Sequence, residues 1–137
     1  MKNANFCEAP TFIKKKLTSS QKRGLLYEKR ALKIVKEVYP NLDRKWIVYE
    51  KNDQKRLCEP DSFLILDNRL IIFEVKLNWK AHAYWKMETL YGPLLKMIYP
   101  KLEQSYIQIC RHVLGHKEKK FYKLDNLPQK GCIHLWV

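Results

Sequence analysis

Hydrophobic residues recur at helical spacing in an early segment of the chain. A spacing of three to four residues predicts an amphipathic helix over about residues 20–39. Residues 18–20 offer hydroxyl groups for an N-cap, and Pro40 would end the helix. Glu28 falls on or beside the apolar stripe, where a carboxylate is unexpected. The stripe consists of Leu25, Leu32, Val35 and Tyr39.

Residues 45–77 carry the pattern of β-structure. Residues 45–51 alternate between polar and apolar side chains, and residues 51–56 are typical of a polar turn. Two runs rich in β-forming residues follow, at 61–66 and 69–77. The Asp-Asn pair at 67–68 between them is typical of a two-residue hairpin turn. This part of the chain is therefore predicted to form three strands.

A second helix is predicted over residues 81–99, with the Gly-Pro pair at 92–93 kinking or splitting it. Residues 105–110 show the alternation of a short strand, although a helix continuing to Gly115 is an open alternative. Residues 132–137 form a last candidate strand. The predicted order is helix, three strands, helix and strand, followed by a small extension, which indicates an α/β fold.

At 137 residues, the chain is expected to form one domain. We assign residues 1–17 to an N-terminal arm, 18–110 to the core and 111–137 to a C-terminal extension. No segment has the apolar length of a membrane span, so we expect no membrane partner. The N-terminus lacks the apolar region of a signal peptide, and the four cysteines include no CxxC pair. An intracellular, reduced protein is the expectation.

The most hydrophobic stretch contains charged residues that a buried strand pair would normally exclude. In a hairpin turning at 67–68, Leu66 faces Arg69, and this register places Asp61 opposite Glu74. Two facing carboxylates repel each other unless a positive charge lies between them. Mg²⁺ supplies such a charge and commonly binds one or two carboxylates. Lys76 would lie beside it on the same face. The alternative is that these charges lie on a solvated face of the sheet.

Lys and Arg number 27 against 14 acidic residues, a formal net charge of +13. An excess of this size indicates a polyanionic partner, and nucleic acid is the most common one. A merely basic domain without such a partner is the alternative.

The segments EPD at 59–61 and EVK at 74–76 resemble the signature of the PD-(D/E)xK nuclease superfamily. The resemblance covers roughly residues 20–110. It implies a restriction-endonuclease-like core, with a helix, three strands, a helix and a strand arranged as a mixed central sheet flanked by helices. The element order predicted above agrees with that arrangement.

The resemblance also implies roles for individual residues. Asp61 and Glu74 would ligate Mg²⁺ or Mn²⁺, with the backbone carbonyl of Val75 as a further ligand. Lys76 would act on the nucleophilic water. Glu28 would assist directly or through water, since members of the family often carry a Glu on the first helix.

Other residues are candidates for supporting roles. Glu59 is a possible spare ligand, with an exposed strand-edge acid as the alternative, and Gln108 is a possible accessory residue. Aromatic and basic residues after the motif would stack on bases or follow a phosphate backbone, although Trp79 and Trp85 are equally compatible with the core. The candidates for nucleic-acid binding are Lys14, Lys15, Lys16, Trp79, Lys80, Tyr84, Trp85 and Lys86.

The expected function is Mg²⁺-dependent hydrolysis of DNA phosphodiester bonds by an endonuclease, with RNA as substrate and exonucleolytic action as open alternatives. Small enzymes of this kind are commonly homodimers. One alternative keeps the fold and cuts branched DNA, as a Holliday-junction-type resolvase does. Another is a basic nucleic-acid-binding protein without catalysis, and a third is a small interaction protein. A compact nuclease of this kind would suit a virus or mobile element, acting inside the host cell.

Overall fold

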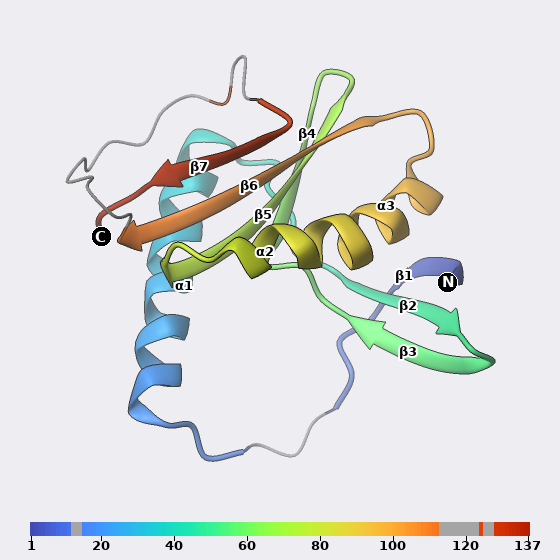
Figure 1. Cartoon of the computed structure of the whole chain (residues 1–137), viewed down its shortest axis with the longest axis horizontal. Helices are drawn as coiled ribbons and strands as arrows, with labels where there is room; N and C mark the ends of the chain where they lie inside the picture. Colours follow the sequence, from blue (N-terminus) through green and yellow to red (C-terminus); the bar gives the residue numbers. More distant parts are fainter. Residues whose placement is uncertain (12–14, 113–123, 125–127) are drawn as a thin grey trace.

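The computed structural model of the protein describes residues 1–11, 15–112, 124 and 128–137. It is an α/β structure, in which two β-sheets pack with two helical segments (Figure 1). The elements described, in chain order, are β1 (Lys2–Cys7), α1 (Ser19–Val38), β2 (Trp46–Lys51), β3 (Gln54–Cys58), β4 (Ser62–Leu66), β5 (Arg69–Asn78), α2 (Ala81–Lys86), the π-helical turn η1 (Met87–Tyr91), α3 (Gly92–Ile98), β6 (Glu103–His112) and β7 (Lys130–His134).

The larger sheet has the order β4-β5-β6-β7. Strands β4 and β5 form the predicted antiparallel hairpin, with Leu66 facing Arg69. Asp67 in the turn has a φ of 53°, as a two-residue hairpin turn requires. Strands β5, β6 and β7 run parallel to one another. Residues 103–112 form a strand, so the helical alternative for this segment is wrong.

The smaller sheet is antiparallel, with the order β1-β2-β3. It corrects three predictions. Strand β2 was expected in the central sheet, but it pairs with β1 and β3 instead, and the segment before it is joined to β4 by an isolated bridge between Asp43 and Phe63. Part of the expected arm is strand β1, and the expected polar turn ends early, since β3 begins at Gln54. Half of the residues of β1 and nearly all of those of β3 are exposed, and neither strand has a fully buried residue, so neither shows the alternation that marks a half-buried strand.

Helix α1 begins where the sequence predicts. The Thr18 hydroxyl accepts a hydrogen bond from the Gln21 amide (3.1 Å), and the Gln21 side chain accepts one from the Thr18 amide (2.9 Å). The buried stripe runs through Tyr27, Ala31 and Val35. Leu25, predicted to face inward, is half exposed, because a residue two positions before Tyr27 lies on the opposite side of the helix.

The second helical segment spans α2, η1 and α3, close to the predicted range. It continues through the Gly-Pro pair by way of the π-helical turn, and the pair opens α3. A Cβ atom on Gly92 would lie 2.7 Å from the Tyr106 hydroxyl of β6, so the close approach of helix and sheet requires glycine. No helix in the described ranges is both long and apolar enough to cross a membrane.

The two helical segments cover opposite faces of the larger sheet (Figure 1). Phe73 and Val75 of β5 pack in one hydrophobic cluster with α1. Leu70 and Ile72 pack in the other cluster, with η1, α3 and β2. Strand β5 is therefore covered on both sides, as inner strands of parallel sheets usually are.

Candidate functional site

Glu74 lies on β5 in the middle of this buried strand. Its residue exposure is 1%, and it faces the same side as Leu70 and Ile72. Its Oε2 is 3.6 Å from Nζ of Lys76, which is partly exposed. Its Oε1 is buried and has no hydrogen-bond partner among the residues described. A buried carboxylate oxygen without a partner is costly, so the structure leaves a place for a positive group here.

Asp61 lies immediately before β4. The observed register pairs Ser62 with Phe73, so Asp61 and Glu74 are the next residues beyond this last pair. Its Oδ2 accepts a hydrogen bond from the Val75 amide (2.8 Å). Burial raises the pKa of Asp61, while this hydrogen bond and the Lys76 charge lower it. Burial and the charge of Asp61 together raise the pKa of Glu74 to about 7. The two acids therefore lie close enough to oppose each other's ionisation.

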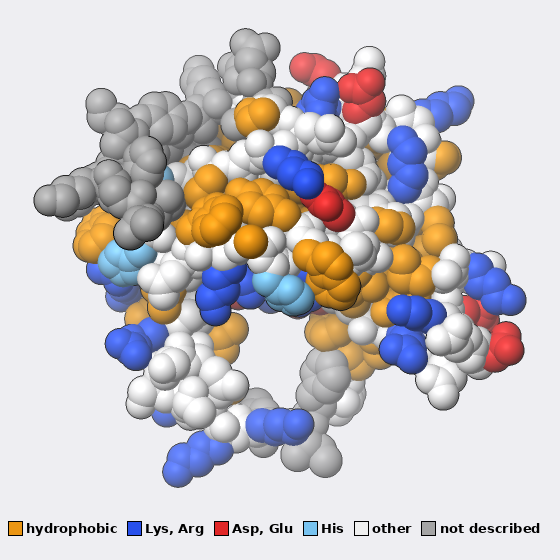
Figure 2. Space-filling model, in the orientation of Figure 1, with side chains coloured by type: hydrophobic (Ala, Val, Ile, Leu, Met, Phe, Trp, Pro, Cys, Tyr) orange, Lys and Arg blue, Asp and Glu red, His pale blue; other side chains and the backbone are white. Residues whose placement is uncertain are grey.

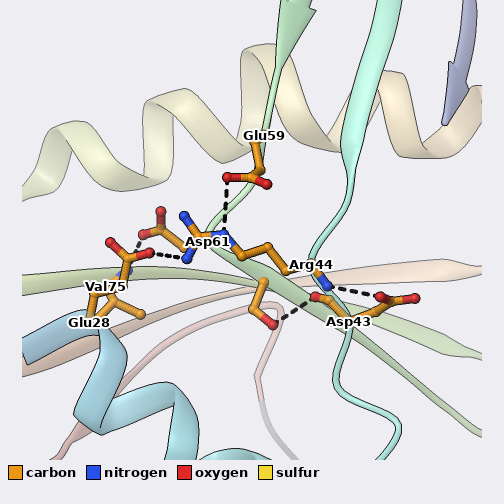
Figure 3. A network of polar contacts seen from close by, with 7 residues as sticks. Glu28, Asp43, Arg44, Glu59, Asp61 and Val75 are labelled. Carbon is orange, nitrogen blue, oxygen red and sulfur yellow. Dashed lines mark hydrogen bonds and ion pairs between the residues drawn. The ribbon is translucent and has the colours of Figure 1, made fainter. Parts of the chain in front are cut away.

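Glu28 reaches the same region from α1 (Figure 3). Burial and then the charge of Asp61 raise the pKa of Glu28, and Glu28 in turn contributes to the raised pKa of Glu74. The structure thus brings together the three acids that the sequence predicts for the site. They come from a helix, the start of one strand and the interior of the next.

Arg44 is a site residue that the sequence analysis missed. Its guanidinium donates to Oε1 of Glu28 (2.6 Å) and to Oε1 of Glu59 (3.0 Å), and Figure 3 shows it between the two. Glu59 is therefore neither free nor fully exposed, because Arg44 holds it at the edge of the acidic group. In a chain with 27 Lys and Arg residues, no sequence signal distinguishes this one.

The second helical segment contributes Lys86 and Tyr91. The charge of Lys86 lowers the pKa of Glu74 and of Asp61, and its Nζ lies 5.2 Å from the centre of the Tyr91 ring. Burial and then the two acids raise the pKa of Tyr91. Lys86, which was predicted as a nucleic-acid contact, lies near the acids. Tyr91 ends η1, and π-helical turns are frequent at functional sites.

Gln108 is the neighbour of Glu74 on β6 and is fully buried. Its Oε1 accepts from the Lys80 amide (2.8 Å), and its Nε2 donates to the Lys80 carbonyl (2.9 Å). Both ends of the side-chain amide are thus occupied by the backbone just before α2. These two hydrogen bonds hold the backbone just before α2 against β6, next to the strand that carries Glu74.

Trp79 and Trp85 are 46% and 59% exposed, so the alternative that they belong to the core is wrong. Figure 2 shows hydrophobic side chains gathered near the middle of the face that carries α2 and α3, with Lys and Arg around them. Tyr84 donates a hydrogen bond from its hydroxyl to the Gly131 carbonyl (2.9 Å). The backbone of Lys80 is held by Gln108, Lys15 and Lys16 are exposed, and Lys14 lies outside the described residues.

A groove of about 510 Å³ leads to the site between the start of α1 and the end of β5. Glu28, Val75 and Lys76 are among the residues that line it, together with Leu17 and Lys80. The groove gives solvent and an extended ligand access to the side of the site that carries Lys76.

Asp61 and Glu74 fit a hard divalent cation, although no group of three or more His, Cys, Asp or Glu residues in the described chain forms a metal site alone. Mg²⁺ commonly takes one or two carboxylates and completes its shell with water and phosphate oxygens. The unpartnered Oε1 of Glu74 and the mutual repulsion of the two acids suit such an ion. The Val75 amide points to Asp61, and the amide and carbonyl of one strand residue share a side, so the Val75 carbonyl is oriented toward the same edge.

Comparison of the chain with known protein families, with curated proteins and with solved structures gave no match. The resemblance to PD-(D/E)xK nucleases therefore rests on the sequence motif.

Proposed function

We propose that the protein is a metal-dependent nuclease of the PD-(D/E)xK type that hydrolyses DNA phosphodiester bonds as an endonuclease. One observation carries the proposal: a fully buried Glu74 with an unpartnered oxygen lies opposite Asp61, with the ammonium group of Lys76 next to it. A buried acidic pair is unfavourable for stability alone, so its placement is best explained by a cation that it binds.

In the proposed mechanism, Asp61, Glu74 and the Val75 carbonyl hold Mg²⁺ or Mn²⁺. When bound there, such an ion would supply Lewis-acid polarisation of the scissile phosphate and a bound water of lowered pKa. The Val75 amide orients the Asp61 carboxylate, and Gln108 fixes the helix that brings Lys86 near the acids. Lys76 orients the attacking water and stabilises negative charge on the phosphate as the P–O bond breaks. Arg44 holds Glu28 at the edge of the site.

The test is cleavage by purified protein of supercoiled plasmid, linear duplex, single strands, flaps, four-way junctions and RNA, with Mg²⁺, Mn²⁺ or EDTA. Glu74→Gln and Lys76→Gln should each reduce Mg²⁺-dependent cleavage by about a hundredfold or more while retaining DNA binding, since they remove a metal ligand and a charge acting on the reacting atoms. Their matched controls are Glu50→Gln and Lys55→Gln, the same substitutions on β2 and β3, which should leave cleavage within about twofold of wild type.

Equal cleavage by wild type and Glu74→Gln would show that the activity belongs to a contaminant. A wild type that binds DNA and cuts none of the substrates would establish the non-catalytic alternative. Selective cutting of four-way junctions would identify the resolvase alternative, and nicking of the plasmid would establish endonucleolytic action.

A further inference from the structure

A second pocket, of about 360 Å³, lies beside the groove and carries an unusual charge pattern. Arg23 and Arg30 of α1 line it, together with Arg111 and His112 from the end of β6. Arg23 and Arg30 are two helical turns apart, so both face the same way as Tyr27 between them. Among the described residues, no aspartate or glutamate lines this arginine pocket.

No carboxylate of the described residues neutralises the three guanidinium groups. None of them forms an ion pair with any carboxylate in the described part of the chain. Arg23 makes only a long contact to the Ser20 hydroxyl (3.4 Å), and Nε of Arg111 is buried without a hydrogen-bond partner among the described residues. Like charges gathered in one pocket repel each other, and an anion would relieve that repulsion.

Two aromatic contacts orient the Arg111 side chain before any ligand binds. Its guanidinium lies 4.5 Å from the centre of the Trp136 ring, and His112 packs edge-on against the same ring at 5.0 Å. Stacking on an aromatic face leaves the N–H edge of a guanidinium available to a ligand in its plane. That edge suits two oxygens of a phosphate, which arginine binds through paired hydrogen bonds.

The arginine pocket is continuous with the groove of the candidate site. Ser20, Leu77 and Asn78 line both. Asn78 follows Lys76 by two residues on β5, on the order of 7 Å along the strand. A phosphate in the pocket would thus lie near the scissile phosphate without occupying the same position.

We propose that the arginine pocket binds a phosphate group of the nucleic-acid substrate, next to the one that is cleaved. The inference rests on the proposed function in that its ligand is a nucleic acid. Three guanidinium groups accommodate either an internal phosphodiester or the more highly charged phosphate at the end of a strand. In both cases the pocket anchors the substrate strand relative to Lys76 and Glu74, and so sets which bond reaches them.

The experiment measures DNA binding in the Glu74→Gln background, where cleavage cannot interfere. Arg23→Gln and Arg30→Gln are compared with Lys29→Gln, which removes the same charge from a residue of α1 that does not line the pocket. Fluorescence anisotropy gives Kd for labelled oligonucleotides with a 5′-phosphate or a 5′-hydroxyl, over a series of salt concentrations. Circular dichroism verifies that each variant is folded.

We expect each arginine variant to weaken binding about tenfold and to reduce the slope of log K against log salt by about 1, the loss of one phosphate contact. Lys29→Gln should change Kd by less than about twofold. A loss confined to 5′-phosphorylated strands assigns the terminal phosphate, and a loss on both strands assigns an internal one. Arg23→Gln and Arg30→Gln behaving like Lys29→Gln would overturn the proposal.

The result is independent of catalysis. If wild-type protein cuts DNA and the arginine variants match the control, the pocket proposal fails and the proposed function stands. If wild-type protein cuts nothing and the arginine variants lose the salt-dependent contact, the nuclease assignment fails and the phosphate pocket stands. Absence of any nucleic-acid binding would overturn both.

Discussion

The hairpins β2–β3 and β4–β5 have loops of the same length but differ in burial. Each has a two-residue loop, closed by Lys51 facing Gln54 in the first and Leu66 facing Arg69 in the second. Residues with positive φ occur in both turns. Nearly all of β3 is exposed, whereas β5 is buried from Leu70 to Val75. The same local structure is thus solvated in one case and enclosed in the other.

The difference in burial between the two hairpins determines whether a charged residue in a strand needs a partner. Lys55 and Arg56 on β3 are exposed, so water satisfies them and they require no explanation. Glu74 on β5 is shielded from water, so its charge must be compensated by protein groups or by a bound ion. A charge within a strand is therefore informative only when the strand is covered on both faces.

The largest stability difference between the hairpins is expected from removing an apolar side chain. Ile72→Ala on β5 should lower the free energy of unfolding by about 2–5 kcal/mol, because Ile72 is fully buried and the deletion leaves a cavity. Leu57→Ala on β3, where the side chain is 44% exposed, should cost less than about 1 kcal/mol. Urea denaturation of the two variants measures this. Equal losses would mean that β3 is also buried, in an assembly or by another segment.

The second difference is a pH dependence specific to β5. The folded protein retains the Glu74 proton up to about pH 7, whereas an unfolded chain releases it near 4.5. The folded state therefore binds more protons in this window, and the stability of metal-free protein falls as the pH rises from about 4.5 to about 7. The shift corresponds to a loss on the order of 3 kcal/mol. The decrease is measured by urea denaturation in EDTA at a series of pH values.

Glu74→Gln should remove most of this decrease and should be more stable than wild type above pH 7. Glu50→Gln, on β2, should retain the wild-type profile because Glu74 is still present. A wild-type protein with no loss of stability between pH 4.5 and 7 would contradict the buried placement of the Glu74 carboxyl.

The smallest difference is the response to metal. Binding of Mg²⁺ at tenfold above its Kd should stabilise the folded protein by about 1.4 kcal/mol, which raises Tm by a few degrees. The rise should disappear in Asp61→Asn and Glu74→Gln and persist in Glu50→Gln. Thermal unfolding with MgCl₂, compared with NaCl at equal ionic strength, measures it. An equal rise in every variant would place the ion elsewhere on the surface.

The proximity of Asp61 and Glu74 could be predicted because a two-residue turn sets the register of its hairpin, and the two acids directly follow the last observed pair, Ser62 and Phe73. The helical spacing of the apolar residues was enough to predict that Glu28 lies on or beside the inward-facing side of α1. The positions of Arg44, Lys86 and Tyr91 could not be predicted in this way, because they depend on how separate segments pack. Strands β1 and β3 were missed since exposed strands carry no hydrophobic alternation.

Local order along this chain follows from short-range rules of period, turn geometry and capping, which operate within about ten residues. They are sufficient for the helices, for the main hairpin and for the pairing of its two acids. Contacts between distant segments decide the rest. They determine whether those acids are buried and which positively charged side chains lie near them. They also bring Arg23, Arg30 and Arg111 to one pocket. The free energy of those contacts comes from burial of apolar area across the whole domain, which no single stretch of sequence records.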